Sequence, residues 1–132
     1  MSLFDIYKAT KVGISDSLFA SIAGQKMGTP VNLFDGITEK GIYDATDGTP
    51  QSSAYYVRNV NPIFCEPNTE YHYSNEGSGS FGAILYYDEN DVYLGYNEPD
   101  TTTNNFTSLA DAHYMNFYAN RNQTNMSITK VK

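Results

Sequence analysis

The stretch that decides the fold is Phe81–Tyr87 (FGAILYY), followed by Asp88–Asp91 (DEND) and Val92–Leu94 (VYL). The first run is almost wholly apolar, which is typical of a strand in the middle of a sheet with both faces covered. The four polar residues after it favour a turn, and the next three residues favour a strand again. We therefore predict a β-hairpin whose first strand lies inside the fold.

The segments before this hairpin alternate between apolar and polar residues. Ile63 and Cys65 are two residues apart, and after a Pro-Asn turn Tyr71 and Tyr73 repeat the same spacing. Successive side chains of a strand point to opposite faces of a sheet, so this spacing predicts strands with one face toward a core. We expect these four side chains to point inward.

Turn residues separate short β-compatible runs from Thr29 to the end of the chain. Gly, Pro, Asn and Asp recur between the runs, and neither helical periodicity nor an internal repeat is present there. This spacing is typical of an all-β protein. We predict one domain over residues 29–132, an antiparallel β-sandwich closed by a strand near Met126–Thr129.

Residues 1–28 have a different pattern. Ser15-Asp16 precedes a short apolar run that ends at Gly24, which predicts a capped helix of two turns or so. Such a short helix is marginally stable alone and must dock on something else. We interpret residues 1–28 as an N-terminal connector or assembly segment with weak helix.

Charge and hydropathy disfavour several partners. The net charge is -7, from 15 acidic and 8 basic side chains, and it would repel a phosphate backbone, so we expect no nucleic-acid partner. No apolar run approaches the roughly 18 residues of a membrane span. Met1–Lys11 lacks the basic start and apolar region of a signal peptide. We expect an extracellular or virion location, for which lysis would be one route, and no membrane partner.

The sequence offers no clear catalytic machinery, so we expect a protein that is not an enzyme. His72 and His113 are the two histidines, and neither lies in a nucleophile motif. The single cysteine, Cys65, cannot form an internal disulfide and is interpreted as a core residue. No cofactor is predicted. Calcium bound by Asp88–Asp91 stays an open alternative, although the EF-hand spacing and its glycine are absent.

Aromatic content points to ligand stacking. The chain has 12 Tyr and 7 Phe but no Trp. Sugars bind by laying an apolar ring face on an aromatic ring while polar groups contact the hydroxyls. If Met115 and Phe117 face the core, their alternating neighbours line the other face of that sheet. The candidate carbohydrate-binding residues are Tyr114, Asn116, Tyr118, Arg58 and Tyr96. The alternative is that these tyrosines cover the core or a subunit interface.

Four segments in order resemble a known family. They are Asn32–Asp35 (NLFD), Ile63–Tyr71 (IFCEPNTEY), Tyr86–Asn90 (YYDEN) leading to Tyr93, and Phe106–Phe117 (FTSLADAHYMNF). Together they resemble the jelly-roll carbohydrate-binding-like domains on tail and baseplate proteins of phages that infect Gram-positive bacteria.

The resemblance implies a jelly-roll β-sandwich that attaches to cell-surface or cell-wall polysaccharide of the host. It also implies contacts with other tail or baseplate proteins and assembly as a homotrimer. Two positions depart from the family pattern, because Leu109 replaces a usual proline and Asn116 replaces a basic residue. If that basic residue binds sugar in relatives, its loss changes or abolishes the site.

Two other functions stay open. The chain could be a purely structural virion or fibre domain whose tyrosines pack against neighbouring subunits. It could also be an ancillary binding module of a glycan-degrading enzyme whose catalytic domain lies outside this chain.

Overall fold

The computed structural model describes residues 31–131, so the predicted connector and its helix lie outside the described residues. This part of the chain contains eleven strands and no helix. Every pairing between its strands is antiparallel. The prediction of an all-β, antiparallel fold is therefore confirmed for residues 31–131.

The strands form two larger sheets and a short ribbon. One sheet has the order β1-β4-β10-β7-β8 with β5 also paired to β10, the second has the order β11-β6-β9, and β2 and β3 form the ribbon. The strands are β1 (Thr38–Lys40), β2 (Ile42–Tyr43), β3 (Pro50–Gln51), β4 (Tyr56–Asn59), β5 (Ile63–Phe64), β6 (Glu70–Gly77), β7 (Phe81–Tyr87), β8 (Tyr93–Asn97), β9 (Asn105–Thr107), β10 (Tyr114–Asn120) and β11 (Gln123–Lys130).

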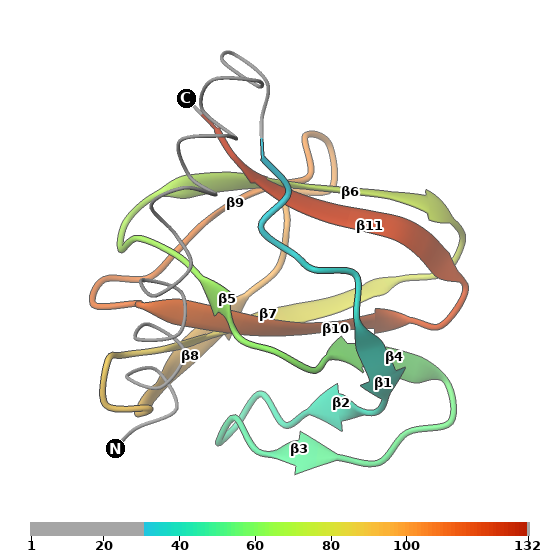
Figure 1. Cartoon of the computed structure of the whole chain (residues 1–132), viewed down its shortest axis with the longest axis horizontal. Coiled ribbons are helices and arrows are strands. Elements are labelled where there is room, and N and C mark those ends of the chain that lie inside the picture. The colour runs from blue at the N-terminus through green and yellow to red at the C-terminus, as the bar shows by residue number, and fades with distance from the viewer. Residues whose placement is uncertain (1–30, 132) are drawn as a thin grey trace, which may run out of the picture.

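The main core lies between the two larger sheets, which form two layers (Figure 1). The larger sheet contributes Ile84, Tyr86, Met115, Phe117 and Ala119, and the smaller one contributes Tyr71, Tyr73, Phe106 and Ile128. Burying an apolar side chain of this size contributes about 1.5–3 kcal/mol. The predicted inward positions Ile63, Tyr71 and Tyr73 are confirmed as buried, and Cys65 packs against the same core.

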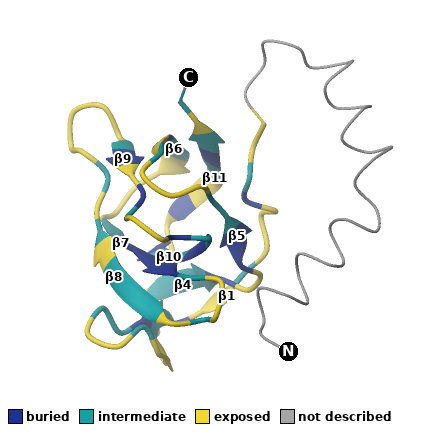
Figure 2. Cartoon of the chain, turned by 90° about the vertical axis from the view of Figure 1, so that its left-hand side faces the viewer, coloured by how far each residue is buried: buried dark blue, intermediate teal, exposed yellow. Residues whose placement is uncertain are grey.

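The hairpin predicted from the deciding stretch is present. β7 and β8 pair across Asp88–Asp91, where the Asp88 carboxylate accepts hydrogen bonds from the N–H groups of Asn90 and Val92. Asp91 adopts a left-handed φ of 65°. These short Asp-to-backbone bonds are what favour aspartate at the start of a turn. Figure 2 shows that β10 and β5 carry buried residues, whereas β8 is mostly half-buried.

The β2–β3 ribbon forms a third level, against the outer face of the larger sheet (Figure 1). A second cluster of buried residues lies under it: Tyr43, Ala83, Leu85, Tyr87 and Tyr114. Three phenol hydroxyls fix the ribbon and its loop by donating to backbone carbonyls. The acceptors are Asn59 for Tyr43, Gly48 for Tyr87 and Ala45 for Tyr93.

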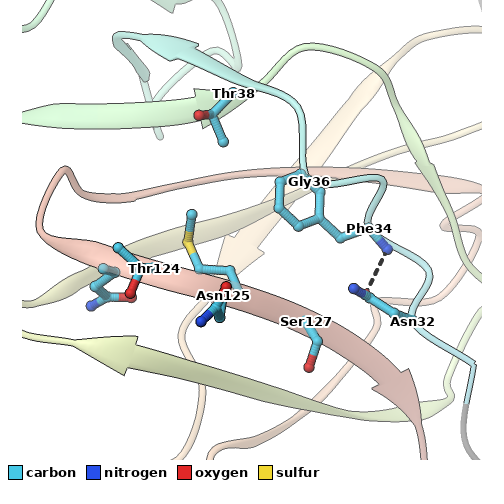
Figure 3. Close-up of a pocket in the computed structure, with 9 residues that line it drawn as sticks. Asn32, Phe34, Gly36, Thr38, Thr124, Asn125 and Ser127 are labelled. Atoms are coloured by element: carbon cyan, nitrogen blue, oxygen red, sulfur yellow. Dashed lines mark hydrogen bonds between the residues drawn. The ribbon is translucent and has the colours of Figure 1, made fainter.

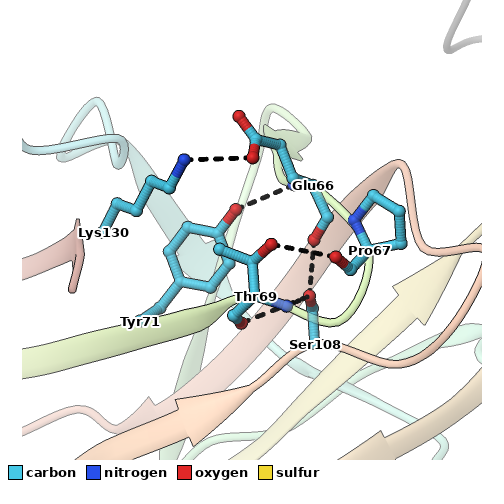
Figure 4. A network of polar contacts seen from close by, with 6 residues as sticks. All are labelled: Glu66, Pro67, Thr69, Tyr71, Ser108 and Lys130. Atoms are coloured by element: carbon cyan, nitrogen blue, oxygen red, sulfur yellow. Dashed lines mark hydrogen bonds and ion pairs between the residues drawn. The ribbon is translucent and has the colours of Figure 1, made fainter. Parts of the chain in front are cut away.

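A polar network joins the loop between β5 and β6 to the loop after β9 (Figure 4). The buried Ser108 hydroxyl donates to the Glu66 carbonyl and accepts from the Thr69 N–H, while the Tyr71 hydroxyl accepts from the Glu66 N–H. Lys130 reaches the Glu66 carboxylate at 3.0 Å. Two of the four segments that carry the family resemblance therefore contact each other here.

Within residues 31–131, no helix is long and apolar enough to cross a membrane.

Candidate functional site

Four tyrosines gather on the outer face of the larger sheet, beside the ribbon. We call Tyr56 of β4, Tyr118 of β10, and Tyr93 and Tyr96 of β8 the tyrosine face. Residues paired across antiparallel strands share a face of the sheet. The partners of these tyrosines include Ala83 for Tyr118, Leu85 for Tyr96 and Tyr87 for Tyr93, all three in the outer cluster.

A β-bulge in β7 shapes the middle of the tyrosine face. Tyr118 pairs with Ala83 and Ala119 pairs with Phe81, which leaves Gly82 unpaired between them. A Cβ atom at Gly82 would lie 2.2 Å from Cδ2 and Cε2 of Tyr118, so the Tyr118 ring lies directly against this glycine. Glycine in a strand often marks a place where another group approaches the backbone closely. The half-buried ring of Tyr118 therefore covers the sheet at this point, and we call it the aromatic floor of the site.

A second bulge brings Tyr93 and Tyr96 to the same side. Tyr87 pairs with Tyr93 and Tyr86 pairs with Gly95, so Leu94 is the extra residue on β8. Without the bulge, residues three apart would point to opposite faces. Leu94 instead packs against the main core, while Tyr96 stands 51% exposed on the outer face.

The rings of Tyr56 and Tyr118 form a corner. Their centroids are 5.7 Å apart and their planes cross at 83°. Both side chains are half-buried. An aromatic floor with a ring standing across its edge offers a ligand two apolar surfaces at once.

Two carboxylates influence the ionisation of the phenols on this face. Burial raises the pKa of Tyr118, and its neighbours Tyr56, Glu98, Tyr96 and Asp44 raise it further. Burial also raises the pKa of Tyr93 to about 12, with Tyr87, Tyr96, Asp44 and Tyr118 adding to the shift. Both phenols stay protonated at neutral pH; the Tyr93 hydroxyl donates to the Ala45 carbonyl, so of the two it is the Tyr118 hydroxyl that can donate to a ligand. The Asp44 carboxylate accepts hydrogen bonds from the Thr46 N–H and the Gln51 side-chain amide, and its charge and that of Glu98 make the surroundings of Tyr118 negative.

Arg58, a predicted sugar-binding residue, fastens the ribbon to the sheet. Its guanidinium contacts the Glu39 carboxylate at 2.6 Å, donates to the carbonyls of Ile42 and Gln51 at 3.0 Å, and lies 5.5 Å from the ring centroid of Tyr43. Its side chain is 16% exposed. These contacts occupy most of its donors, so Arg58 supports the site without presenting an open guanidinium.

Tyr114 and Asn116 lie on the outer face of the sheet, as predicted. However, they lie in the part of that face that the ribbon covers. Tyr114 is only 3% exposed and stacks on Tyr87, with ring centroids 4.8 Å apart. The Asn116 side-chain oxygen accepts from Asn59 at 2.8 Å. This placement differs from the expected open strip, because the ribbon, which sequence periodicity did not reveal, covers part of the face.

The structure thus brings Tyr118 and Tyr96 together on the outer face of the sheet. Tyr114 and Asn116 lie beneath the ribbon, and Arg58 lies beside the site and holds the ribbon to the sheet. Sequence reasoning missed Tyr93 and Asp44 as members of the site. The signal for Tyr93 was hidden by the bulge, and Asp44 reaches the site only because the ribbon folds over the sheet.

Two other potentially reactive side chains of the described residues, Cys65 and His72, are engaged in packing or hydrogen bonding within the fold. Burial raises the pKa of Cys65 to about 12, so its thiol is a poor nucleophile at neutral pH. His72 Nδ1 lies 2.7 Å from the side-chain oxygen of Asn105. Among residues 31–131, no group of three or more His, Cys, Asp or Glu side chains could hold a metal ion.

Comparisons with protein-family models, with curated proteins and with solved structures found no match to this chain.

Proposed function

We propose that this protein is a non-catalytic carbohydrate-recognition domain of a phage tail or baseplate, which attaches to glycan on the host cell surface. We further propose that its two layers are a β-sandwich of the jelly-roll type. The sequence resemblance supports both proposals. The observation that carries the binding function is the Tyr118 ring lying on Gly82, with Tyr56 across it and Tyr96 beside it.

The tyrosine face has the chemistry that a sugar requires. An aromatic floor accepts the apolar face of a pyranose ring, and nearby acceptors bind its hydroxyl groups. Tyr118 supplies the floor, and the charges of Glu98 and Asp44 make its surroundings negative. Arg58 is engaged with Glu39 and the ribbon. A surface with carboxylates and no available guanidinium favours a neutral glycan over an anionic one.

A shallow face of this kind binds a single sugar weakly. Display of several linked copies raises the effective concentration and converts weak binding into stable attachment. A homotrimer on a tail structure, as the resemblance implies, would provide that display. We expect the assembled oligomer to bind glycan-coated surfaces more firmly than free oligosaccharides.

The test is binding of the purified protein to Gram-positive cells and to a glycan array. We expect Tyr118→Ala and Tyr96→Ala each to reduce binding by about fivefold, since stacking contacts of this type contribute about 1 kcal/mol each. Tyr55→Ala is the matched control, because Tyr55 is a 67% exposed tyrosine whose ring lies against Arg121 and is not part of the tyrosine face. Equal loss in all three variants, or no glycan binding by the folded wild type, would contradict the proposal.

One observation favours the alternative of a structural virion domain. Ile37 and Val60 are 52% and 44% exposed and meet through a backbone hydrogen bond at the β1 edge of the larger sheet. Neighbouring exposed apolar side chains are typical of subunit contacts. Sedimentation of the wild type and of an Ile37→Ser, Val60→Ser variant tests this role. Oligomers that dissociate in the variant, in a protein without glycan affinity, would favour it.

A further inference from the structure

We propose that a second binding site, for a single neutral sugar unit, lies between residues 32–38 and the first half of β11. A pocket of about 540 Å³ opens there (Figure 3). Its size lies within the range of about 300–1,000 Å³ that is common for small-molecule sites. It shares no lining residue with the tyrosine face, so the inference does not depend on binding at that face.

The pocket lies where the edges of the two larger sheets diverge. β1 is an edge strand of one sheet and β11 is an edge strand of the other. The chain leading to β1 is pinned to β11 by Asn32, whose side-chain oxygen accepts from the N–H groups of Phe34 and Ile128 at 3.0 Å. Beyond that anchor the two segments separate, which leaves room between the layers.

A bulge in β11 gives the pocket its shape. Thr124 pairs with Glu76 and Ser127 pairs with Ser74, so two residues of β11 face one residue of β6. Asn125, the first of the two, adopts a left-handed φ of 49° and donates from its side-chain amide to the Glu76 carboxylate. Asparagine tolerates this conformation better than most residues, but the conformation still carries a backbone cost. On the opposite wall, a Cβ atom at Gly36 would meet nothing within 4 Å.

The lining is neutral and amphipathic, and this decides the class of ligand. Phe34 and Met126, which belong to or pack against the main core, contribute its apolar surface. Its polar side chains carry only hydroxyl and amide groups; they are Thr38, Thr124, Ser127, Asn32, Gln123 and Asn125. Hydroxyls and amides can both donate and accept, as sugar hydroxyls do. None of the residues that line the pocket is ionisable, so a charged ligand would find no counter-charge among them.

The experiment is an NMR titration of the full chain with methyl glycosides of glucose, galactose and N-acetylglucosamine. We expect at least one of them to cause saturable shifts at the amides of Thr124, Asn125, Met126 and Gly36. Methyl glucuronide should bind more weakly than methyl glucoside, because the carboxylate has no cationic partner in the lining.

A double variant, Thr38→Val and Thr124→Val, tests the residues themselves, because it removes two hydroxyls while keeping the branched shape. We expect about a tenfold loss of affinity, which corresponds to about 1.4 kcal/mol. Thr129→Val on the same strand is the matched control and should leave affinity unchanged. Tyr118→Ala should also leave it unchanged, which separates this site from the tyrosine face. No saturable shift with any of the three glycosides, or equal affinity in the double variant and the wild type, would overturn the proposal.

Discussion

The side-chain oxygen of Asn59 accepts a hydrogen bond from the backbone N–H of Phe117 at 2.8 Å. These residues meet where β4 ends and β5 has not yet begun, so β10 has no strand partner on that side at this point. The Asn59 amide also donates to the Asn61 carbonyl and to the Asn116 side chain. Asn59 is fully buried and bridges the gap in the sheet with its own side chain.

Replacing this bridge should cost substantial stability. Asn59→Leu leaves the Phe117 N–H buried without its acceptor, and an unsatisfied buried group costs about 1–3 kcal/mol. We expect a fall of at least about 2 kcal/mol in the free energy of unfolding, measured by urea denaturation. Asn61→Ala is the control, since its side chain bonds Asp35 on the exposed surface. Similar losses in the two variants would contradict the bridging role.

The contact between Tyr118 and Gly82 predicts a double-mutant cycle. Gly82→Ala places a methyl group where the Tyr118 ring lies, and such overpacking costs about 1–3 kcal/mol. The penalty should shrink when the ring is absent, in a Tyr118→Ala background, although the Tyr118 carbonyl at 2.7 Å keeps part of it. Thermal unfolding of the four proteins measures the coupling. An equal penalty in both backgrounds would mean that the ring does not cover this glycine.

Arg58 should control the local order of the ribbon. Arg58→Met removes the Glu39 contact and the bonds to Ile42 and Gln51 but keeps much of the side-chain length. We expect faster amide hydrogen exchange over residues 41–51 and little change in β6 and β11. Arg58→Lys should restore only part of the protection, because an ammonium cannot reproduce the fork of the guanidinium.

An exposed ion pair provides the control for this experiment. Lys130→Met removes the contact to Glu66. The side chains of Lys130 and Glu66 are 51% and 66% exposed, and surface ion pairs of this kind contribute about 0–1 kcal/mol. We expect no change in exchange over residues 41–51 in this variant. Unchanged exchange there in Arg58→Met as well would contradict the fastening role of Arg58.

Alkaline pH should destabilise the protein through its buried tyrosines. Burial raises the pKa of Tyr43, Tyr71 and Tyr93 to about 12, whereas tyrosine in an unfolded chain ionises near about 10. Between these two values the unfolded state has released protons that the folded state still holds. The free energy of unfolding should therefore be unaffected by these groups below about pH 10 and fall as pH rises toward about 12.

Urea denaturation at about pH 9 and about pH 11 checks this, with phenolate absorbance recorded in parallel. Tyr71→Phe should flatten the decline, because one of the shifted phenols is gone. A decline that is equally steep in Tyr71→Phe would argue against its contribution.

Much of the fold could be predicted from local patterns. The alternation around Tyr71 and Tyr73 gave the inward face of β6, and the apolar run Phe81–Tyr87 with its acidic turn gave the central hairpin. Met115 and Phe117 face the core, which was the condition for placing Tyr114, Asn116 and Tyr118 on the outer face. These features follow from the period of two in strands and from turn residues, both of which are local properties of the chain.

The candidate site was only partly predictable, because strand bulges change which residues share a face. The bulge at Leu94 places Tyr93 and Tyr96 on one side, and the bulge at Gly82 makes room for the Tyr118 ring. A one-residue insertion in a strand pairing depends on the partner strand, so alternation within one strand cannot reveal it.

The sequence by itself determined the strand content, the central hairpin and the inward faces of the long strands, because these depend on the spacing of apolar and turn residues. The tertiary structure alone decided that the β2–β3 ribbon covers Tyr114, that Arg58 is engaged in fastening the ribbon, and that a pocket opens beside β11. Each of these outcomes depends on contacts between segments far apart in the chain, and the geometry of such contacts is set only when the layers pack together.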